Sequence, residues 1–221
     1  MAAGRPAYQQ VILADGPYAY WRLNETSGTV AADSSGNGRD GSYVGGFSLA
    51  SAALVPSTDE EYAALDGSTG YVNITPAANF CAGTDWTIEM WVNFAAMGAK
   101  GASLLCFFAL TGFSFYASGN GIDYQPKSGY AASAWAGLPL AVGTPKHIVL
   151  SARGANYAGT LYFNAAAHTG SSVYAPGIST LLGIGLPSSY MNYMNGCVGE
   201  VALYDHALSA QQVRNHWLAG A

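Results

Sequence analysis

Residues 36–41, GNGRDG, match the G-x-G-x-x-G pattern of dinucleotide-binding loops, and acidic residues follow at positions 59–61. A dinucleotide loop must follow a buried strand and open a helix whose N-terminus holds the pyrophosphate. The residues that follow here, SYVGGFSL, are β-branched, aromatic and interrupted by glycine, and the preceding TVAADSS does not have the pattern of a buried parallel strand. The motif therefore predicts a turn that enters a β-strand, and not a cofactor cradle.

The overlapping stretch DSSGNG, which begins at Asp33, starts like the calcium-binding loop of an EF-hand. The twelfth loop position, where that motif has a bidentate Glu, is Val44, and no helical pattern flanks the loop. A looser calcium site would use Asp33, Asp40 and the carbonyl oxygens of the glycines. The alternative is a tight turn, because Asp, Asn and Gly favour turns, and this second interpretation is the simpler one.

Glycosidase chemistry would need two carboxyl groups, about 5 Å apart in a retaining enzyme. The internal strand carboxylates are Glu89 and Glu200, and each stands alone in its strand. The sequence contains neither a G-x-S-x-G nor an H-E-x-x-H motif, and its four histidines lack metal-ligand spacing. His206 and His216 flank a predicted C-terminal helix, where we expect them to face solvent or cap the helix. We predict that the protein is not an enzyme.

Two segments combine aromatic rings with side-chain amides, the residue types that contact sugars. Rings stack on sugar faces, and amides supply directional hydrogen bonds; the same residues also suit protein interfaces, or simply pack on the core. All three interpretations stay open. The segments are IDYQPKSGYAASAWAG and SSYMNYMNG, and the predicted ligand-binding residues are Tyr124, Tyr130, Trp135, Tyr190, Asn192 and Tyr193.

The elements that would position these residues are mainly strands. In WTIEMWVNF, residues 86–94, the two-residue period places Trp86, Ile88, Met90, Val92 and Phe94 on one face, and Thr87, Glu89, Trp91 and Asn93 on the other. Similar short segments alternate with Gly-rich turns along the chain, which predicts an antiparallel β-sandwich. We expect a single domain over residues 1–221.

Both ends of the chain carry helix signals. Residues 1–16 are predicted to form an N-terminal arm or short helix, ended by Gly16-Pro17. In LSAQQVRNHWLAG, Ser209 is a good N-cap, Gln212 completes a capping box, and Leu208 with Val213 is placed for a hydrophobic staple. The C-terminus is therefore predicted to be a short helix that docks on a sheet.

Composition excludes several classes of function. Only 8 Lys and Arg stand against 13 Asp and Glu, and the net charge of −5 leaves no basic face for nucleic acid. No apolar run approaches the roughly 20 residues that a membrane span requires, so we expect no membrane insertion. The three cysteines, Cys81, Cys106 and Cys197, are widely spaced among apolar residues and are predicted to be buried and unpaired.

Six segments, in order along nearly the whole chain, resemble laminin G-like domains of the concanavalin A-like jelly-roll superfamily. The resemblance implies an all-β jelly roll, in which two curved antiparallel sheets pack face to face. It also implies glycan binding by the concave face or rim loops in many members, and a structural calcium. The segments are AYWRLNETSGTVAADSSGNGRDGSYVGG, ALDGSTGYVNI, WTIEMWVNF, PKHIVLSARGANYAGTLYFNAAA, LLGIG and NGCVGEVALYDHALSAQQVRNHWLAG.

The sequence departs from the family at two places. An Asp-Glu pair late in the family pattern is Gly199-Glu200 here, so the resemblance leaves Asp33, Asp40 and Glu200 as calcium ligands, with one carboxylate missing. The Asn-Gly turn after the Leu-Tyr strand is Asn164-Ala165, which predicts a differently shaped hairpin. No cofactor is required by this interpretation, and a structural calcium is the metal it allows.

Context leads to two expectations of function. The chain begins at Met1 without a secretory signal and is poor in charge. By analogy with phage particles that carry such jelly rolls, we expect a non-catalytic virion protein, assembled in the host cytoplasm as capsid decoration or tail component. Its partners would be other virion proteins, further copies of itself, or cell-surface glycans. The alternative is an extracellular lectin-like carbohydrate-binding module of a bacterial glycan-processing system.

Overall fold

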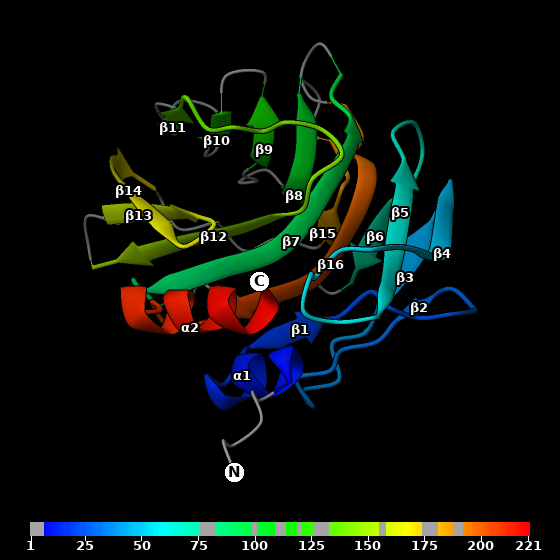
Figure 1. Cartoon of the computed structure of the whole chain (residues 1–221), viewed down its shortest axis with the longest axis horizontal. Helices are drawn as coiled ribbons and strands as arrows, with labels where there is room; N and C mark the ends of the chain where they lie inside the picture. Colours follow the sequence, from blue (N-terminus) through cyan, green and yellow to red (C-terminus); the bar gives the residue numbers. More distant parts are fainter. Residues whose placement is uncertain are drawn as a thin grey trace.

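Figure 1 shows the computed structural model of the chain, which describes residues 7–75, 83–98, 101–108, 114–118, 121–125, 133–154, 158–173, 181–187 and 192–221. Two antiparallel eight-stranded sheets pack face to face, which confirms the predicted sandwich. The first sheet has the order β14-β13-β12-β7-β16-β5-β4, with β1 also paired to β16, and the second has the order β11-β10-β9-β8-β15-β6-β3-β2.

The strands of the first sheet are β1 (Ala19–Trp21), β4 (Phe47–Ala53), β5 (Glu61–Asp66), β7 (Trp86–Ala96), β12 (Lys146–Arg153), β13 (Ala158–Phe163), β14 (Ala166–Ser172) and β16 (Asn195–Tyr204). Those of the second sheet are β2 (Val30–Ala31), β3 (Gly41–Val44), β6 (Tyr71–Ile74), β8 (Ala102–Phe108), β9 (Ser114–Ser118), β10 (Gly121–Gln125), β11 (Ser133–Ala136) and β15 (Leu181–Ile184). The helices are α1 (Tyr8–Ala14) and α2 (Ala210–Gly220).

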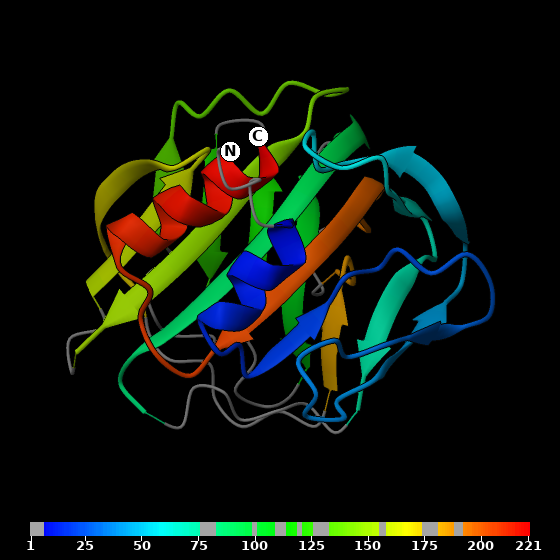
Figure 2. The same cartoon turned by 60° about the horizontal axis from the view of Figure 1, so that its bottom comes forward.

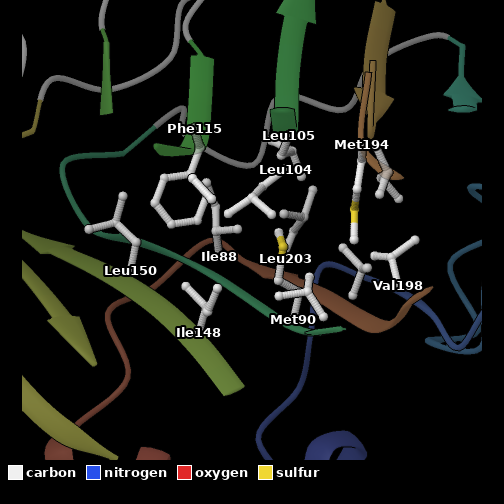
Figure 3. Close-up of a cluster of buried hydrophobic side chains, with 14 of the residues drawn as sticks. Ile88, Met90, Leu104, Leu105, Phe115, Ile148, Leu150, Met194, Val198 and Leu203 are labelled. Atoms are coloured by element: carbon white, nitrogen blue, oxygen red, sulfur yellow. The ribbon is translucent and has the colours of Figure 1, made fainter. Parts of the chain in front are cut away.

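The core lies between the two sheets and is apolar. The five inward residues predicted for β7 are all fully buried in it. Figure 3 shows how Ile88, Met90 and Leu203 of the first sheet meet Leu104, Leu105 and Phe115 of the second. Burial of large aliphatic and aromatic side chains of this kind contributes roughly 1.5–3 kcal/mol each, so this layer fixes the pairing of the sheets.

The outer face of the first sheet is covered in part by α1 and α2, which lie across its middle strands (Figure 2). Ser209 caps α2 with the complete capping box, and Leu208 and Val213 are both buried, as predicted. Ile12 of α1 and Val213 of α2 join Trp91 and Tyr204 in a second apolar cluster on this face. The helices therefore leave only part of the sheet's outer surface open.

Two turns can be compared with the shapes that the sequence motifs predicted. GNGRDG is a turn, with Gly36 and Gly38 at φ of 85° and 69°, and it leads directly into β3, as predicted. Asn164 and Ala165 both have positive φ, 50° and 63°, the conformation typical of a two-residue hairpin turn. The prediction of a differently shaped hairpin was wrong, because hydrogen bonds between Asn164 and the backbone of His147 hold this conformation without a glycine.

Candidate functional site

An open groove lies on the outer face of the first sheet, beside the region that the helices cover. It is a hollow of about 310 Å³, within the range of small-ligand sites. Strands β4, β5, β7 and β16 supply its walls and floor, and we call it the Asn93 groove. It is lined by Ser51, Ala52, Ala64, Leu65, Asn93, Phe94, Ala95, Gly143, Asn195, Gly196 and Cys197.

Strand register explains the composition of the Asn93 groove. Cys197 lies opposite Asn93 on β7 and opposite Ala64 on β5. Asn93 belongs to the outer face of β7, because its neighbours Val92 and Phe94 are buried in the core. Small side chains on adjacent strands therefore form a shallow floor, and the longer amide side chain of Asn93 stands beside it.

Two side-chain amides in this groove lack partners. The Oδ1 atom of Asn93 is shielded from solvent and accepts no hydrogen bond. Within the described part of the chain, neither Asn93 nor Asn195 makes a side-chain hydrogen bond to another residue. Because a buried polar atom without a partner is costly, the groove offers hydrogen-bonding capacity that the fold itself does not use.

A second hollow, of about 240 Å³, continues from the Asn93 groove and shares Ala64 and Leu65 with it. Gly46, Phe47, Ser48 and Asp66 complete its lining. The carboxylate of Asp66 accepts hydrogen bonds from the backbone N–H groups of Ser68, Thr69 and Gly70. Hydrogen bonds from Ser68 and from these N–H groups lower the pKa of Asp66 well below its usual range, so this end of the groove is anionic at neutral pH.

Aromatic residues lie at the rim where the chain passes from β15 to β16. Tyr193 and Tyr71 are half-buried, with ring centroids 6.4 Å apart. Tyr193 and Asn195 flank Met194, which is fully buried, so both side chains lie outside the core. Asn192, also half-buried, packs against Gly98. Of the predicted ligand-binding residues, Asn192 and Tyr193 precede the groove residue Asn195 by three and two positions, Asn192 forms a bridge to Ala102 of β8, and neither lines the groove.

The remaining predicted ligand-binding residues do not join this site. Tyr124 is fully buried and Trp135 is 5% exposed, both in the core between the sheets. Their prediction as sugar-stacking residues was wrong, because the two-residue alternation of β10 and β11 turns these rings inward, and a stacked sugar needs an open ring face. Tyr130 and Tyr190 lie outside the described residues.

The predicted calcium ligands Asp33 and Asp40 are both used in shaping the turn. Asp33 Oδ1 accepts from the N–H groups of Tyr20 and Ser35, and Oδ2 accepts from the N–H of Arg39. These bonds outweigh partial burial and lower the pKa of Asp33. Asp40 Oδ1 accepts from the N–H of Asp33 at 2.8 Å. The carboxylates thus satisfy backbone donors, which fits a turn better than a cation site.

The third predicted calcium ligand, Glu200, lies in a buried cluster of its own. It accepts hydrogen bonds from Tyr20, from Tyr62 at 2.8 Å and from Arg22 at 3.1 Å. Within the described ranges, no three His, Cys, Asp or Glu side chains form a group that would hold a metal. The predicted ligand set of Asp33, Asp40 and Glu200 therefore does not fit a common calcium site, while calcium binding at another place stays a prediction.

Steric crowding explains why a glycine stands at position 199, next to Glu200. A Cβ atom at this position would lie 2.4 Å from the ring of Tyr62 and 2.9 Å from the carbonyl oxygen of Arg22. Real Cβ contacts are not this short, so an Asp at this position would displace the ring or the backbone. The glycine is thus required by the packing around Glu200.

Glu89, the other strand carboxylate, is the centre of a second buried polar cluster, beneath the helices. His147 Nε2 lies 2.7 Å from its Oε1, and His216 Nδ1 lies 2.9 Å from its Oε2. Tyr8 and Tyr204 donate their hydroxyls to the same carboxylate. The cluster reaches Asp15, 2.8 Å from His216 Nε2. Glu89, His147 and His216 are each fully buried.

The charges of this cluster stabilise one another. Burial opposes ionisation of Glu89, but His216 and the hydrogen bond from His147 hold its pKa below the usual range. Burial likewise opposes the charge of His216, but the attraction and hydrogen bond of Glu89, together with Asp15, raise the pKa of His216 to about 9. The expectation that His216 faces solvent or caps the helix was wrong, whereas the side chain of His206 is 43% exposed as predicted.

The two amides of the groove, Asn93 and Asn195, were not predicted from the sequence as a site. Asn93 was placed correctly on the outer face of its strand, but nothing local marks it as open, since Thr87, Glu89 and Trp91 on the same face are covered. Asn195 joins Asn93 in the lining of one groove only through the pairing of β16 with β7. Cys106 and Cys197 are buried and unpaired, as predicted, and Cys81 lies outside the described residues. None of the helices described is long and apolar enough to cross a membrane.

Solved structures share this fold at low sequence identity. A structure from work on ganglioside-dependent cell entry of botulinum neurotoxin type C aligns with a TM-score of 0.70 and 13% identity, over 96% of this chain and 53% of that one. A Trypanosoma rangeli sialidase aligns with a TM-score of 0.64 and 18% identity, over 92% and 32%. This chain thus spans about half of the neurotoxin chain and a third of the sialidase.

A third structure matches over nearly its whole length. Domain 4 of AbnA, an extracellular arabinanase of Geobacillus stearothermophilus solved with arabinotriose, aligns with a TM-score of 0.66 and 16% identity, over 90% of this chain and 97% of that domain. A search of curated protein sequences gives no match. The Laminin_G_3 family model matches residues 66–214, more than half of the chain. With its fold and its sequence in agreement, this protein belongs to the concanavalin A-like lectin/glucanases superfamily.

Proposed function

We propose that this protein is a non-catalytic glycan-binding module, and that the Asn93 groove is its binding site. The observation that carries the proposal is a pair of groove amides, Asn93 and Asn195, that make no side-chain hydrogen bond to another described residue, beside an open hollow of about 310 Å³. Asn93 Oδ1 is shielded from solvent, so a ligand reaches that oxygen only after the half-buried side chain rotates. Each amide offers an acceptor oxygen and two N–H donors. Sugar hydroxyls, which both donate and accept, are suitable partners for such groups.

The rim adds the second requirement of a sugar site, an aromatic surface. Tyr193 and Tyr71 lie half-exposed as a pair, and Tyr193 is two residues from Asn195. Neither ring lines the groove, and Tyr71 belongs to β6 of the second sheet, so only a ligand long enough to extend beyond Asn195 would reach these rings, whose faces suit the apolar C–H surface of a sugar. The rim and groove together thus provide stacking and directional hydrogen bonds.

The absence of catalysis is part of the proposal. Glu89 and Glu200 are fully buried, and their oxygens are engaged by His, Tyr and Arg side chains. Glycosidic cleavage would need an acid and a second carboxylate beside an open sugar site. Asp66, the acidic residue of the adjoining hollow, is occupied by its own turn, so binding without cleavage is the function that these residues favour.

Single substitutions test the site directly. Asn93→Ala and Asn195→Ala should each weaken glycan binding by about tenfold, the loss of one or two hydrogen bonds, measured by calorimetry on a ligand from a glycan array. Asn73→Ala is the matched control, since Asn73 lies on a strand of the opposite sheet and outside the groove. Unchanged affinity in both groove variants would reject the proposal.

Cys197 offers an independent measure of occupancy. It lines the Asn93 groove at 8% exposure, whereas Cys106 lies in the other sheet at 3% exposure. Saturating glycan should slow alkylation of Cys197 and leave that of Cys106 unchanged, as followed by peptide mass spectrometry. Equal protection of both thiols would indicate general stabilisation of the fold and not occupation of the groove.

Residence in a phage particle stays a prediction. Its support is surface chemistry suited to contacts: α1 and α2 pack against one another, and they expose Leu13 at 36% and Leu218 at 47%. Mass spectrometry of purified virions would test this location, and light scattering of wild type against Leu13→Ser and Leu218→Ser would test self-association through the helices. A monomer that is absent from virions would leave only the extracellular lectin-like module.

A further inference from the structure

We infer that the Asn93 groove selects an extended, uncharged oligosaccharide and discriminates against acidic sugars. This inference rests on the proposed glycan-binding function and specifies the ligand class of the same site. It follows from three properties of the groove: the hydrogen-bonding demand of Asn93, the charge of the lining, and the continuity of the two hollows.

Asn93 sets the first requirement. Its Oδ1 atom lacks a donor and is shielded from solvent, so a ligand reaches this oxygen only after the half-buried side chain rotates, and the ligand group that meets it must then carry a proton to donate. A sugar hydroxyl does so. An ionised carboxylate has only acceptor oxygens. Beside Asn93 it would donate no hydrogen bond to Oδ1, and its negative oxygens would repel the negative partial charge of that atom.

The lining sets the second requirement. Among the described residues that line the two hollows, none is cationic, and Asp66 is the one charged side chain. Asp66 stays ionised at neutral pH, because the hydrogen bonds of its turn lower its pKa. A uronate or sialate in the groove would thus find no Lys or Arg to pair with, and it would meet the carboxylate of Asp66, which lies opposite Asn195 in the strand pairing. Like charges brought together across an interface are strongly unfavourable.

The third property concerns length. The hollows share Ala64 and Leu65, and Asp66 lies opposite Asn195 in the pairing of β5 with β16, so the two hollows adjoin over β4, β5 and β16. Ala52 and Ala64 line the joined space and leave its floor low. A channel of this form suits several consecutive residues of a chain better than one terminal sugar.

Matched ligands test the charge preference. Neutral oligogalactosides and oligogalacturonates of equal length differ mainly in the carboxylate of each unit. We expect the neutral series to bind about tenfold tighter or more at low salt, and affinity to rise from the monosaccharide to the trisaccharide. Asn93→Ala should weaken binding of the neutral trisaccharide by about tenfold, with Asn73→Ala as the unaffected control.

A charge variant tests the mechanism on a folded protein. Ala64→Lys adds a cation at the junction of the two hollows, and should strengthen oligogalacturonate binding severalfold while the neutral ligand gains nothing; Ala64→Gln controls for size. Equal or tighter binding of oligogalacturonates by the wild type, lost in Asn93→Ala, would overturn the inference and leave the glycan site intact. Binding of either series that ignores both Asn93→Ala and Asn195→Ala would overturn the proposed function as well.

Discussion

His216 Nδ1 of α2 lies 2.9 Å from Glu89 Oε2 of β7, and both side chains are completely buried. The same imidazole bonds to Asp15, just beyond the end of α1, through its other nitrogen. One side chain thus joins both terminal helices to the outer face of the first sheet. The polar cluster that it forms with Tyr8, His147 and Tyr204 holds the helices in place beside the Asn93 groove.

Removing the charge of Glu89 should destabilise the fold strongly. Glu89→Gln removes the buried carboxylate to which both His147 and His216 bond, and breaking a buried pair costs about 3–5 kcal/mol. Denaturant unfolding measures this loss. Glu61→Gln, at an exposed position of β5, is the matched control and should change the free energy of unfolding by less than about 0.5 kcal/mol. Equal stability of both variants would mean that the cluster contributes nothing net.

The free energy of unfolding should fall as the pH rises above neutral. The folded pKa of His216 is raised from 6.5 to about 9, so its contribution is complete below pH 6.5 and is lost as the pH rises through 9. The expected loss is about 3 kcal/mol, measured as the free energy of unfolding between pH 6 and 10. The groups that face His216 are Glu89, Asp15 and Tyr204, and burial raises the pKa of Tyr204 well above its usual value.

Two histidine variants separate this effect from general alkaline sensitivity. His216→Gln should flatten the pH dependence between 6 and 10 while lowering stability overall. His206→Gln, next to the same helix but exposed, should keep the wild-type slope. A slope that persists in His216→Gln would assign the titration to another group.

A methyl group at position 199 should be poorly tolerated. In Gly199→Ala the new Cβ would lie 2.4 Å from the ring of Tyr62, and displacing that ring also disturbs its hydrogen bond to Glu200. We expect a loss of about 1–3 kcal/mol, measured by thermal unfolding. Gly83→Ala is the control, because the nearest atom to its Cβ is 4.0 Å away, and it should be neutral or slightly stabilising; a similar loss there would show that crowding by Tyr62 is not the cause.

The cap of α2 makes a smaller, local contribution. Ser209→Ala removes the hydroxyl that accepts from the N–H of Gln212, which should lower stability by about 1 kcal/mol. Hydrogen exchange should show the first turn of α2 opening more often, with the core strands unchanged. Ser27→Ala, at an exposed position, should have no measurable effect.

Alternating hydrophobicity predicted the inner face of β7 residue by residue, because a strand's period of two is a property of the backbone alone. The capping box of α2 was equally predictable, since its donors and acceptors lie within four residues of one another. His216 was not, because its helix could present that residue to solvent or to a partner. Only the packing of α2 against β7, more than a hundred residues away in the chain, buries it on Glu89.

Tyr124 and Trp135 show the same limit of prediction from sequence, here for residues that were expected to be exposed and are buried. Their residue types suit sugar binding, but the sandwich places both in the core. Composition and local pattern thus determined the sandwich, its strand faces and its helix cap, because these depend on interactions between near neighbours in sequence. The tertiary structure alone decided which outward face stays open. The Asn93 groove exists because four strands from distant parts of the chain meet at a place where the side chains are small and the terminal helices do not reach.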